Sequence, residues 1–269
     1  MRRLPPSKFD LLNFSVPDEP DNCSTNFLLH RSTSTILVDN PLDPKMLVVS
    51  YPTDSPPPMY FIYGKAERPL SIQRLLQELQ TPTDLVVPNS MLNMVSHYWP
   101  VRFSVPVMFL AAPKGHWQPQ TPTNYPVRLL TENDTPQLAR NFSDDPWLWE
   151  FFFTPDQLIR EGMAVGAFVN GHLACVATTL AFTERYVELG VATGPEYRGL
   201  GLALECCRAL SRIQYEQFGR LPCWRTQVHN VASWKVALKL GLEELDRSEK
   251  YLFLSNYQHV GAYAAMVAP

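Results

Sequence analysis

Apolar residues recur along the first part of the chain in two different periods, which predict its elements. Runs of β-branched and aromatic residues, bounded by proline, asparagine or aspartate, predict three strands: Thr35–Asp39, Met46–Tyr51 and Met59–Tyr63. Apolar residues three and four positions apart predict helices at Pro69–Gln80 and Pro88–Trp99. Val101–Ala112 follows as another strand. Residues 1–113 are therefore expected to form a small α/β N-terminal domain.

A proline-rich stretch without periodicity follows at residues 114–126, and its composition predicts a linker. Residues 127–269 are then expected to form a second domain. Its strands are Val127–Leu130, Met163–Val169, His172–Leu180, Tyr186–Thr193 and Pro222–Val228, with one or two more in Glu243–Leu254. Asn170-Gly171 between two apolar runs predicts a hairpin, because both residues tolerate a positive φ.

Helices separate these strands. Thr131, with Asp134 three residues later, predicts a capped helix start, and Thr154 followed by Pro155 predicts another. A long amphipathic helix is expected from about Leu200 to Phe218, and a shorter one at Ala232–Leu240.

The stretch Tyr186–Ala203 carries the clearest chemistry, since a buried strand leads through glycines directly into a helix. The first amides of a helix have no intrahelical acceptor, and the helix dipole adds positive charge there. Such a junction favours a phosphate-bearing ligand. A Walker loop is disfavoured because no lysine follows Gly201, and a dinucleotide fingerprint because Leu204 occupies its third small position.

A third pattern, R/Q-x-x-G-x-G/A, fits Arg198-Gly199-Leu200-Gly201-Leu202-Ala203 at every fixed position. With Asn230-Val231-Ala232-Ser233 and Leu238-Lys239-Leu240-Gly241-Leu242 downstream, the chain resembles the GNAT superfamily of acyl-CoA-dependent N-acyltransferases over about residues 126–254. Through Glu188–Thr193, Tyr197–Ala203 and Pro222-Cys223-Trp224 it also resembles a bacterial GNAT-like subfamily with an extra N-terminal domain. Its two-domain order and P-E-Y-R loop resemble those of glycine N-acyltransferases. The resemblance implies a mixed, mostly antiparallel sheet flanked by helices.

The resemblance also implies a co-substrate, acetyl-CoA or another acyl-CoA, and no metal. The loop amides would hold its pyrophosphate, and the backbones of the preceding strand would hold its pantetheine arm. Asn230 either contacts that arm or serves as a plain helix N-cap. The implied cofactor-binding residues are Val191, Ala192, Thr193, Arg198, Gly199, Leu200, Gly201, Leu202, Ala203, Asn230 and Ser233.

The implied reaction is attack of an amine on a thioester, which requires an uncharged amine. An alkyl ammonium with a pKa of about 10.4 needs roughly 4–5 kcal/mol to lose its proton at neutral pH, so a base is expected. Glu188 is the first candidate, against a solvated or salt-bridged strand glutamate, and His229 is the second. Many family members have a tyrosine, as general acid, where this chain has Ala237, and Tyr251 is the candidate substitute.

Two functions therefore remain open: transfer of an acyl group, expected to be acetyl, to a primary amine, or an acyl-CoA-binding regulatory or sensor module with weakened catalysis. The acceptor would be a small molecule or a protein amine. The aromatic cluster Trp147–Phe153 is expected to belong mostly to the core, and to the acceptor-site wall where it does not. The N-terminal domain would either shape that site or pair subunits in a homodimer.

Composition narrows the remaining classes. The chain is 45% hydrophobic and 18% charged, which is typical of a globular protein, and its net charge of −3 gives no basic field for nucleic acid. Five cysteines without a C-x-x-C pair disfavour a disulfide framework or a zinc site and favour a reducing compartment. The N-terminus lacks the apolar core of a signal peptide, and the longest apolar run, near Val105–Ala112, is too short to span a bilayer. We expect a cytoplasmic protein without membrane partners.

Overall fold

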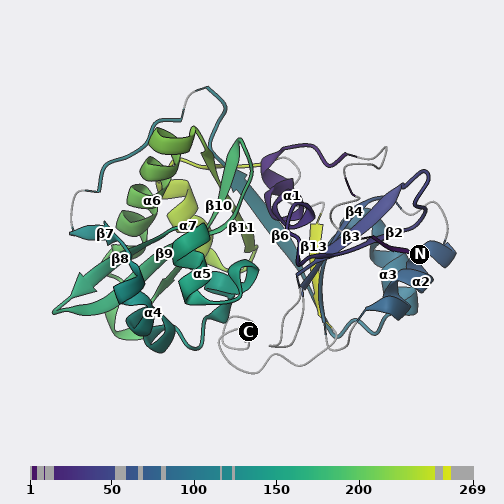
Figure 1. Ribbon diagram of the computed structural model, residues 1–269, viewed down its shortest axis with the longest axis horizontal. Helices are drawn as coiled ribbons and strands as arrows, with labels where there is room; N and C mark the ends of the chain where they lie inside the picture. Colours follow the sequence, from purple (N-terminus) through teal and green to yellow (C-terminus); the bar gives the residue numbers. More distant parts are fainter. Residues whose placement is uncertain are drawn as a thin grey trace. The chain divides into compact units, whose positions relative to one another are not determined.

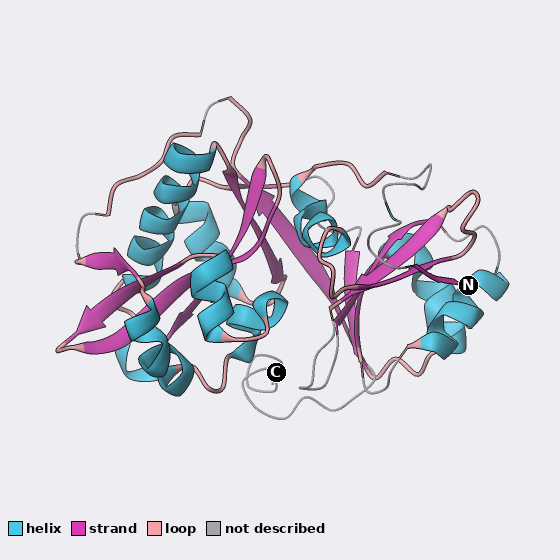
Figure 2. Cartoon of the chain, in the orientation of Figure 1, coloured by secondary structure: helices cyan, strands magenta, loops and turns pink. Residues whose placement is uncertain are grey.

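The computed structural model describes residues 2–4, 9, 15–51, 59–65, 69–79, 83–115, 117–122, 125–245 and 251–255 (Figures 1 and 2). Contacts divide the chain into two compact units whose segments alternate along the sequence. Unit 1 comprises Met1–Pro17, Thr25–Met108 and Asp246–Val260. Unit 2 comprises Asp18–Ser24, Phe109–Leu245 and Gly261–Pro269. The division thus falls after Met108, whereas the sequence predicted it at residues 114–126.

Unit 1 contains a mostly antiparallel sheet with strand order β1-β2-β3-β4-β5-β13-β6, in which β4 and β5 are parallel. Its strands are β1 (Arg2–Leu4), β2 (Thr35–Val38), β3 (Met46–Ser50), β4 (Met59–Gly64), β5 (Asp84–Pro88), β13 (Tyr251–Ser255) and β6 (Phe103–Ala111), the last of which continues into unit 2. The three predicted N-terminal strands and the strand in Val101–Ala112 are confirmed. The sequence did not predict β5, whose apolar run is only three residues long.

Strand β13 corrects the assignment of the whole C-terminal stretch to the second domain. It lies between β5 and β6, where Tyr251 is paired with Pro88 on one side and Val107 on the other. A strand that supplies partners to two neighbours belongs to their sheet regardless of its distance along the chain. The end of the chain therefore returns to unit 1.

The two predicted helices of unit 1 are confirmed as α2 (Pro69–Glu78) and α3 (Leu92–Tyr98), with a 3₁₀ turn, η3 (Asn89–Met91), before α3. The sequence did not predict α1 (Cys23–Leu29), which begins in unit 2. Ile72 and Leu75 of α2 and Val95 of α3 are fully buried in a core with Val48 and Leu85 from the sheet. At roughly 1.5–3 kcal/mol for each fully buried large aliphatic side chain, this core accounts for much of the stability of unit 1.

Unit 2 contains a second mostly antiparallel sheet, with order β11-β10-β9-β8-β7, in which β10 and β11 are parallel. Its strands are β7 (Val127–Leu129), β8 (Ala164–Val169), β9 (His172–Phe182), β10 (Tyr186–Thr193), β11 (Leu221–Gln227) and β12 (Glu243–Glu244), which pairs with the end of β6. Its helices are η2 (Pro20–Asn22), η4 (Glu132–Asp134), α4 (Thr135–Asn141), η5 (Pro146–Phe152), α5 (Pro155–Glu161), η6 (Pro195–Tyr197), α6 (Leu202–Phe218) and α7 (Val231–Lys239). The predicted fold class, mostly antiparallel sheets flanked by helices, is confirmed (Figure 2).

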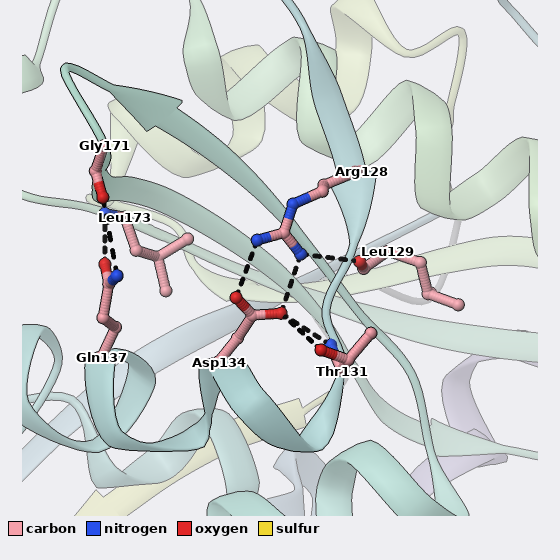
Figure 3. A network of polar contacts seen from close by, with 7 residues as sticks. All are labelled: Arg128, Leu129, Thr131, Asp134, Gln137, Gly171 and Leu173. Atoms are coloured by element: carbon pink, nitrogen blue, oxygen red, sulfur yellow. Dashed lines mark hydrogen bonds and ion pairs between the residues drawn. The ribbon is translucent and has the colours of Figure 1, made fainter.

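Short-range signals account for several junctions of unit 2. Asn170 and Gly171 have φ of 50° and 80° and join β8 to β9 as predicted. The predicted cap at Thr131 forms a capping box with Asp134 (Figure 3). Arg128 of β7 donates two hydrogen bonds of 2.7 Å to the same carboxylate, so one side chain joins the edge strand to the start of α4. This guanidinium holds the pKa of the Asp134 carboxyl well below its usual range.

The predicted linker is part of unit 2 and packs against two of its helices. Trp117 is 5% exposed and donates its indole N–H to the carbonyl of Leu240 at 3.1 Å. Gln120 accepts a 2.7 Å hydrogen bond from Arg208 of α6 and donates one to the backbone carbonyl of Lys239 of α7 at 3.4 Å. Proline content correctly indicated irregular backbone, but the buried tryptophan binds this stretch to two helices.

All five cysteines are buried free thiols. Within the described ranges, no helix is both long and apolar enough to cross a bilayer, and no cluster of three histidine, cysteine or carboxylate side chains has the arrangement of a metal site.

Candidate active site

Strands β10 and β11 pair at one end and then part. Their parallel register pairs Tyr186–Glu188 with Leu221–Cys223, although β10 continues to Thr193 and β11 to Gln227. The register of β10 with β9 shifts between Glu188 and Leu189, which marks a bulge at the same point. A bulge bends its strand and strengthens its twist, so it turns β10 away from β11 here. A gap between two strand backbones begins directly after Glu188.

The register also shows which backbone groups of β10 face this gap. Gly194 donates its N–H to the carbonyl of Ala174 at 2.9 Å, so these residues form a hydrogen-bonded pair with β9. In an antiparallel ladder, hydrogen-bonded pairs alternate with pairs that are not hydrogen-bonded. Thr193 and Val191 fall in the second kind of pair, so their N–H and C=O groups point away from β9. The backbone of Ala192 is directed at β9 instead. Two of the three predicted strand contacts for an extended ligand thus have the required orientation.

The glycine loop forms the N-terminus of α6. Gly199 and Gly201 have φ of 81° and 83°, a region that side-chain-bearing residues avoid, and Gly201 is the N-cap of the helix. Among the described residues, the backbone amides from Gly199 to Ala203 have no hydrogen-bond acceptor, and Gly199–Gly201 are exposed. Arg198 donates its Nε–H to the carbonyl of Thr193 at 3.4 Å, which ties the loop to the strand before it. This arrangement fits an anionic group such as a pyrophosphate.

The other predicted cofactor residues lie where β11 leads into α7. Asn230 accepts a hydrogen bond from the backbone N–H of Ser233 at 3.1 Å, so it caps α7, as one of its two interpretations held. The hydroxyl of Ser233 accepts from the indole N–H of Trp224 at 2.9 Å. Their contacts with a ligand stay a prediction.

Three buried polar atoms close to this junction have no hydrogen-bond partner in the described part of the chain. They are Oε1 of Gln227, Nε2 of His229 and Nε1 of Trp234. A buried polar atom without a partner costs roughly 1–3 kcal/mol, which a bound ligand with amide groups would recover. The sequence singled out His229 alone, because glutamine and tryptophan at strand and helix ends carry no local signal of ligand binding.

Glu188 lies at the vertex of the gap and is 3% exposed. Its Oε1 accepts a hydrogen bond from Nε of Arg225 at 3.0 Å, and its Oε2 accepts one from the hydroxyl of Ser24 at 2.5 Å. The salt-bridged alternative is therefore present in the structure, while a catalytic role stays a prediction. Arg225 was detectable only once the parallel register was known, since Glu188 pairs with Cys223 and Arg225 lies two residues further on the same face. Ser24, 164 positions away, carried no signal at all.

The aromatic cluster is divided between core and surface. Phe151 and Phe152 are at most 2% exposed, which agrees with the core interpretation. Trp147 is half-buried and donates its indole N–H to Asp145 at 2.9 Å. Its ring edge lies over β10 at Gly190, where an added Cβ would be 3.0 Å from Cζ3 of Trp147. This tryptophan therefore contacts β10 two residues beyond Glu188.

The two positions considered for a general acid are separated by the fold. Ala237 is fully buried in α7. Tyr251 lies in β13, a strand of unit 1, whereas the other candidate residues lie in unit 2. The structure thus assigns the general-acid candidate and the glycine loop to different units.

Solved structures share the fold of this chain. A GCN5-related N-acetyltransferase-like protein from Streptococcus suis superposes with a TM-score of 0.66 and 20% identity, covering 89% of this chain and 94% of that one. A GCN5-related N-acetyltransferase from Kribbella flavida gives a TM-score of 0.59 and 12% identity, covering 89% and 95%.

The chain belongs to the GNAT acetyltransferase family, which its sequence matches over residues 21–251. The match extends well beyond the segment that carries recognisable motifs and includes most of unit 1. A curated relative from Streptomyces virginiae, described as an uncharacterized N-acetyltransferase in the mutA 5′ region, is 29% identical over 151 residues. That alignment covers 56% of each of the two chains, so it spans about half the length of the relative.

Proposed function

We propose that this protein is an N-acetyltransferase that transfers the acetyl group of acetyl-CoA to a primary amine. The observation that carries the proposal is the parting of β10 from β11 beside the exposed amides of the glycine loop. A long ligand with a pyrophosphate at one end and amide groups along its arm matches both features. Family membership supports the same reaction class.

Residues of unit 2 would bind acetyl-CoA, stabilise the charge that develops in the reaction and accept a proton. The amides of Gly199–Ala203 bind the pyrophosphate, and the backbones of Val191 and Thr193 bind the arm as an added strand would. Acetyl-CoA supplies the thioester whose carbon the amine attacks. The N–H near Thr193 stabilises the negative charge that develops on the thioester oxygen. The C–N bond forms, the C–S bond breaks with its electron pair leaving on the thiolate, and the amine proton passes to a base, for which Glu188 is the first candidate and His229 the second.

The fit of acetyl-CoA can be judged from groups that the chain leaves without partners. The exposed loop amides have no protein acceptor and are open to an anionic ligand, and the buried atoms of Gln227, His229 and Trp234 are open to its hydrogen-bonding groups. A nucleotide alone would satisfy the loop but would leave the strand backbone unpaired. A CoA thioester can reach both.

The second candidate, an acyl-CoA-binding sensor, rests on two observations. Both carboxylate oxygens of Glu188 have donors, and Ala237 is buried where many relatives have a tyrosine. Two donors from neighbouring side chains give this buried glutamate a structural role that needs no proton transfer from a substrate. CoA binding without turnover would follow.

Calorimetry and a thiol-release assay separate these functions. We expect CoA and acetyl-CoA to bind with similar affinity and ATP to bind more weakly, because ATP lacks the arm. Release of free thiol from acetyl-CoA with a panel of alkyl, aryl and peptide α-amines then establishes turnover and the acceptor class. Absence of CoA binding would refute both functions, and binding without thiol release from any amine would favour the sensor.

A further inference from the structure

A short segment near the N-terminus is part of unit 2, although the chain on both sides of it belongs to unit 1. Asp18 accepts a hydrogen bond of 2.7 Å from the hydroxyl of Thr183, in the turn between β9 and β10. Glu19 forms an ion pair with Lys114 at 3.1 Å. We call Asp18–Ser24 the N-terminal strap. The Asp18 contact secures the strap to the turn before β10, the strand that leads into the glycine loop, and the Glu19 contact secures it to the segment after β6.

The strap ends at Ser24, whose side chain meets Glu188. Ser24 is 4% exposed and Glu188 3%, and the hydrogen bond from Oγ to Oε2 is 2.5 Å long. Arg225, whose side chain is 13% exposed, approaches the other oxygen from β11. One donor on each oxygen fixes the rotation of the carboxylate plane, since turning it would break one of the two bonds.

This fixed carboxylate lies where position matters for the proposed reaction. Glu188 is the last residue of β10 that pairs with β11, and the backbone groups that face the gap begin immediately after it. Charged hydrogen bonds inside a protein are strong and directional, so Ser24 selects one orientation among those that Arg225 alone would allow. Both side chains are buried, so this hydrogen bond lies away from bulk water.

We propose that Ser24, delivered by the N-terminal strap, is a positioning residue that orients Glu188 for acyl transfer. The inference rests on the function proposed above and deepens it. The strap is then a component of the active site. A fragment that contains only the main segment of unit 2, Phe109–Leu245, would lack Ser24.

The test uses the full chain and four variants: Ser24→Ala, Ser24→Thr, Glu188→Gln and the double variant Ser24→Ala/Glu188→Gln. Ser211→Ala is the matched control, because Ser211 is also a buried serine, whose hydroxyl donates to the carbonyl of Cys207 within α6 at 2.6 Å. Steady-state thiol release gives kcat and KM, calorimetry gives the Kd of CoA, and urea unfolding shows that each variant is folded.

We expect Ser24→Ala to lower kcat about tenfold, the loss of one hydrogen bond to a charged group, with the Kd of CoA unchanged. Ser24→Thr, which keeps the hydroxyl, should restore most of the rate, and Ser211→Ala should keep the full rate. In the Glu188→Gln background, removing the Ser24 hydroxyl should have no further effect on kcat, because the charge that it orients is absent.

A purely structural role predicts different results. If Ser24→Ala lowers stability but leaves kcat intact, or if its effect on kcat is the same in the Glu188→Gln background as in the wild-type chain, the positioning role is refuted while acyl transfer stands. The role is also refuted if Glu188→Gln retains the full rate. A wild-type chain that binds CoA but releases no thiol with any amine refutes the proposed function, and the positioning role with it.

Discussion

Replacing Gly201 by glutamate tests the anion site at the start of α6. Gly201 is the N-cap of the helix, with φ of 83°, and an added Cβ would meet no atom within 4 Å. The substitution is therefore accommodated sterically, but a side-chain-bearing residue in left-handed backbone costs about 1–2 kcal/mol. It also puts a carboxylate beside the amides that we assign to the pyrophosphate.

The effect on binding can be estimated from charge alone. Two phosphate charges about 5 Å from the new carboxylate are repelled by roughly 1.7 kcal/mol in total even at the dielectric constant of water. That corresponds to a Kd raised about twentyfold, before any steric exclusion of the ligand by the side chain. Screening by salt reduces this figure, so the loss should shrink as ionic strength rises.

Gly219 provides a matched control at the other end of the same helix. It is the C-cap of α6, with φ of 69°, and an added Cβ there also meets no atom within 4 Å. Gly219→Glu carries the same backbone strain and the same charge, about 25 Å from the loop by helix length. A carboxylate at a helix C-terminus is also unfavourable, so this variant should lose at least as much stability as Gly201→Glu.

Calorimetric titration with CoA, together with urea unfolding of each variant, decides the outcome. We expect Gly201→Glu to bind CoA about twentyfold more weakly than wild type at low salt and Gly219→Glu to bind it normally, although both unfold at lower urea. Equal affinity in the two variants would show that the α6 N-terminus does not hold the ligand and would refute the assignment of the loop.

Two further predictions concern Asp134, which binds Arg128, and Gly190, which contacts Trp147. Asp134→Asn should lower the free energy of unfolding by about 1–2 kcal/mol at pH 7, because it removes the charge bound by Arg128. The pKa of Asp134 is lowered in the folded state, so the difference in unfolding free energy between wild type and variant should be fully present above the usual carboxyl pKa range. It should shrink as pH falls below about 4, where the wild-type carboxylate begins to take up a proton on unfolding. A difference that does not depend on pH would show that the charge of Asp134 does not stabilise the fold. In Gly190→Ala the added Cβ would lie 3.0 Å from Trp147 and 2.9 Å from Leu180. We expect this crowding to lower the free energy of unfolding by about 1–3 kcal/mol. Displacement of Trp147 should also raise the KM of the amine while the Kd of CoA stays unchanged. Thiol-release kinetics check this, and an unchanged amine KM would separate Trp147 from the acceptor site.

The alternation of the two units along the chain changes how the N-terminal half is understood. The sequence suggested an independent domain before residue 114, yet the strap Asp18–Ser24 belongs to unit 2 and β13 returns to unit 1. Chain crossings at both ends argue against either unit being a separable module, and the family match across residues 21–251 agrees with this.

Features that depend on neighbouring residues were predictable. The hairpin at Asn170-Gly171, the capping box of Thr131 and Asp134, and the end of α6 at Gly219 each follow from backbone preferences within four residues. The glycine loop belongs to the same class, because two positive φ angles and a helix start lie within five positions. These local signals were therefore enough to indicate a family.

Features that depend on pairing between distant segments were not predictable. Periodicity marks a strand but does not choose its neighbour, so β13 was assigned to the wrong sheet and β5 was missed. The parting of β10 from β11 is likewise a property of two strands and a bulge, which neither strand's sequence contains.

Glu188 illustrates both what the sequence determines and what only the tertiary structure decides. The sequence alone determined that a carboxylate lies on the strand before the glycine loop, because chain order fixes that distance. Only the tertiary structure decided that this carboxylate is buried between Arg225 and Ser24, since a serine 164 positions away reaches it through the packing of the strap. Local backbone preferences determine which elements form, and the burial of side chains from distant segments decides what each reactive group contacts.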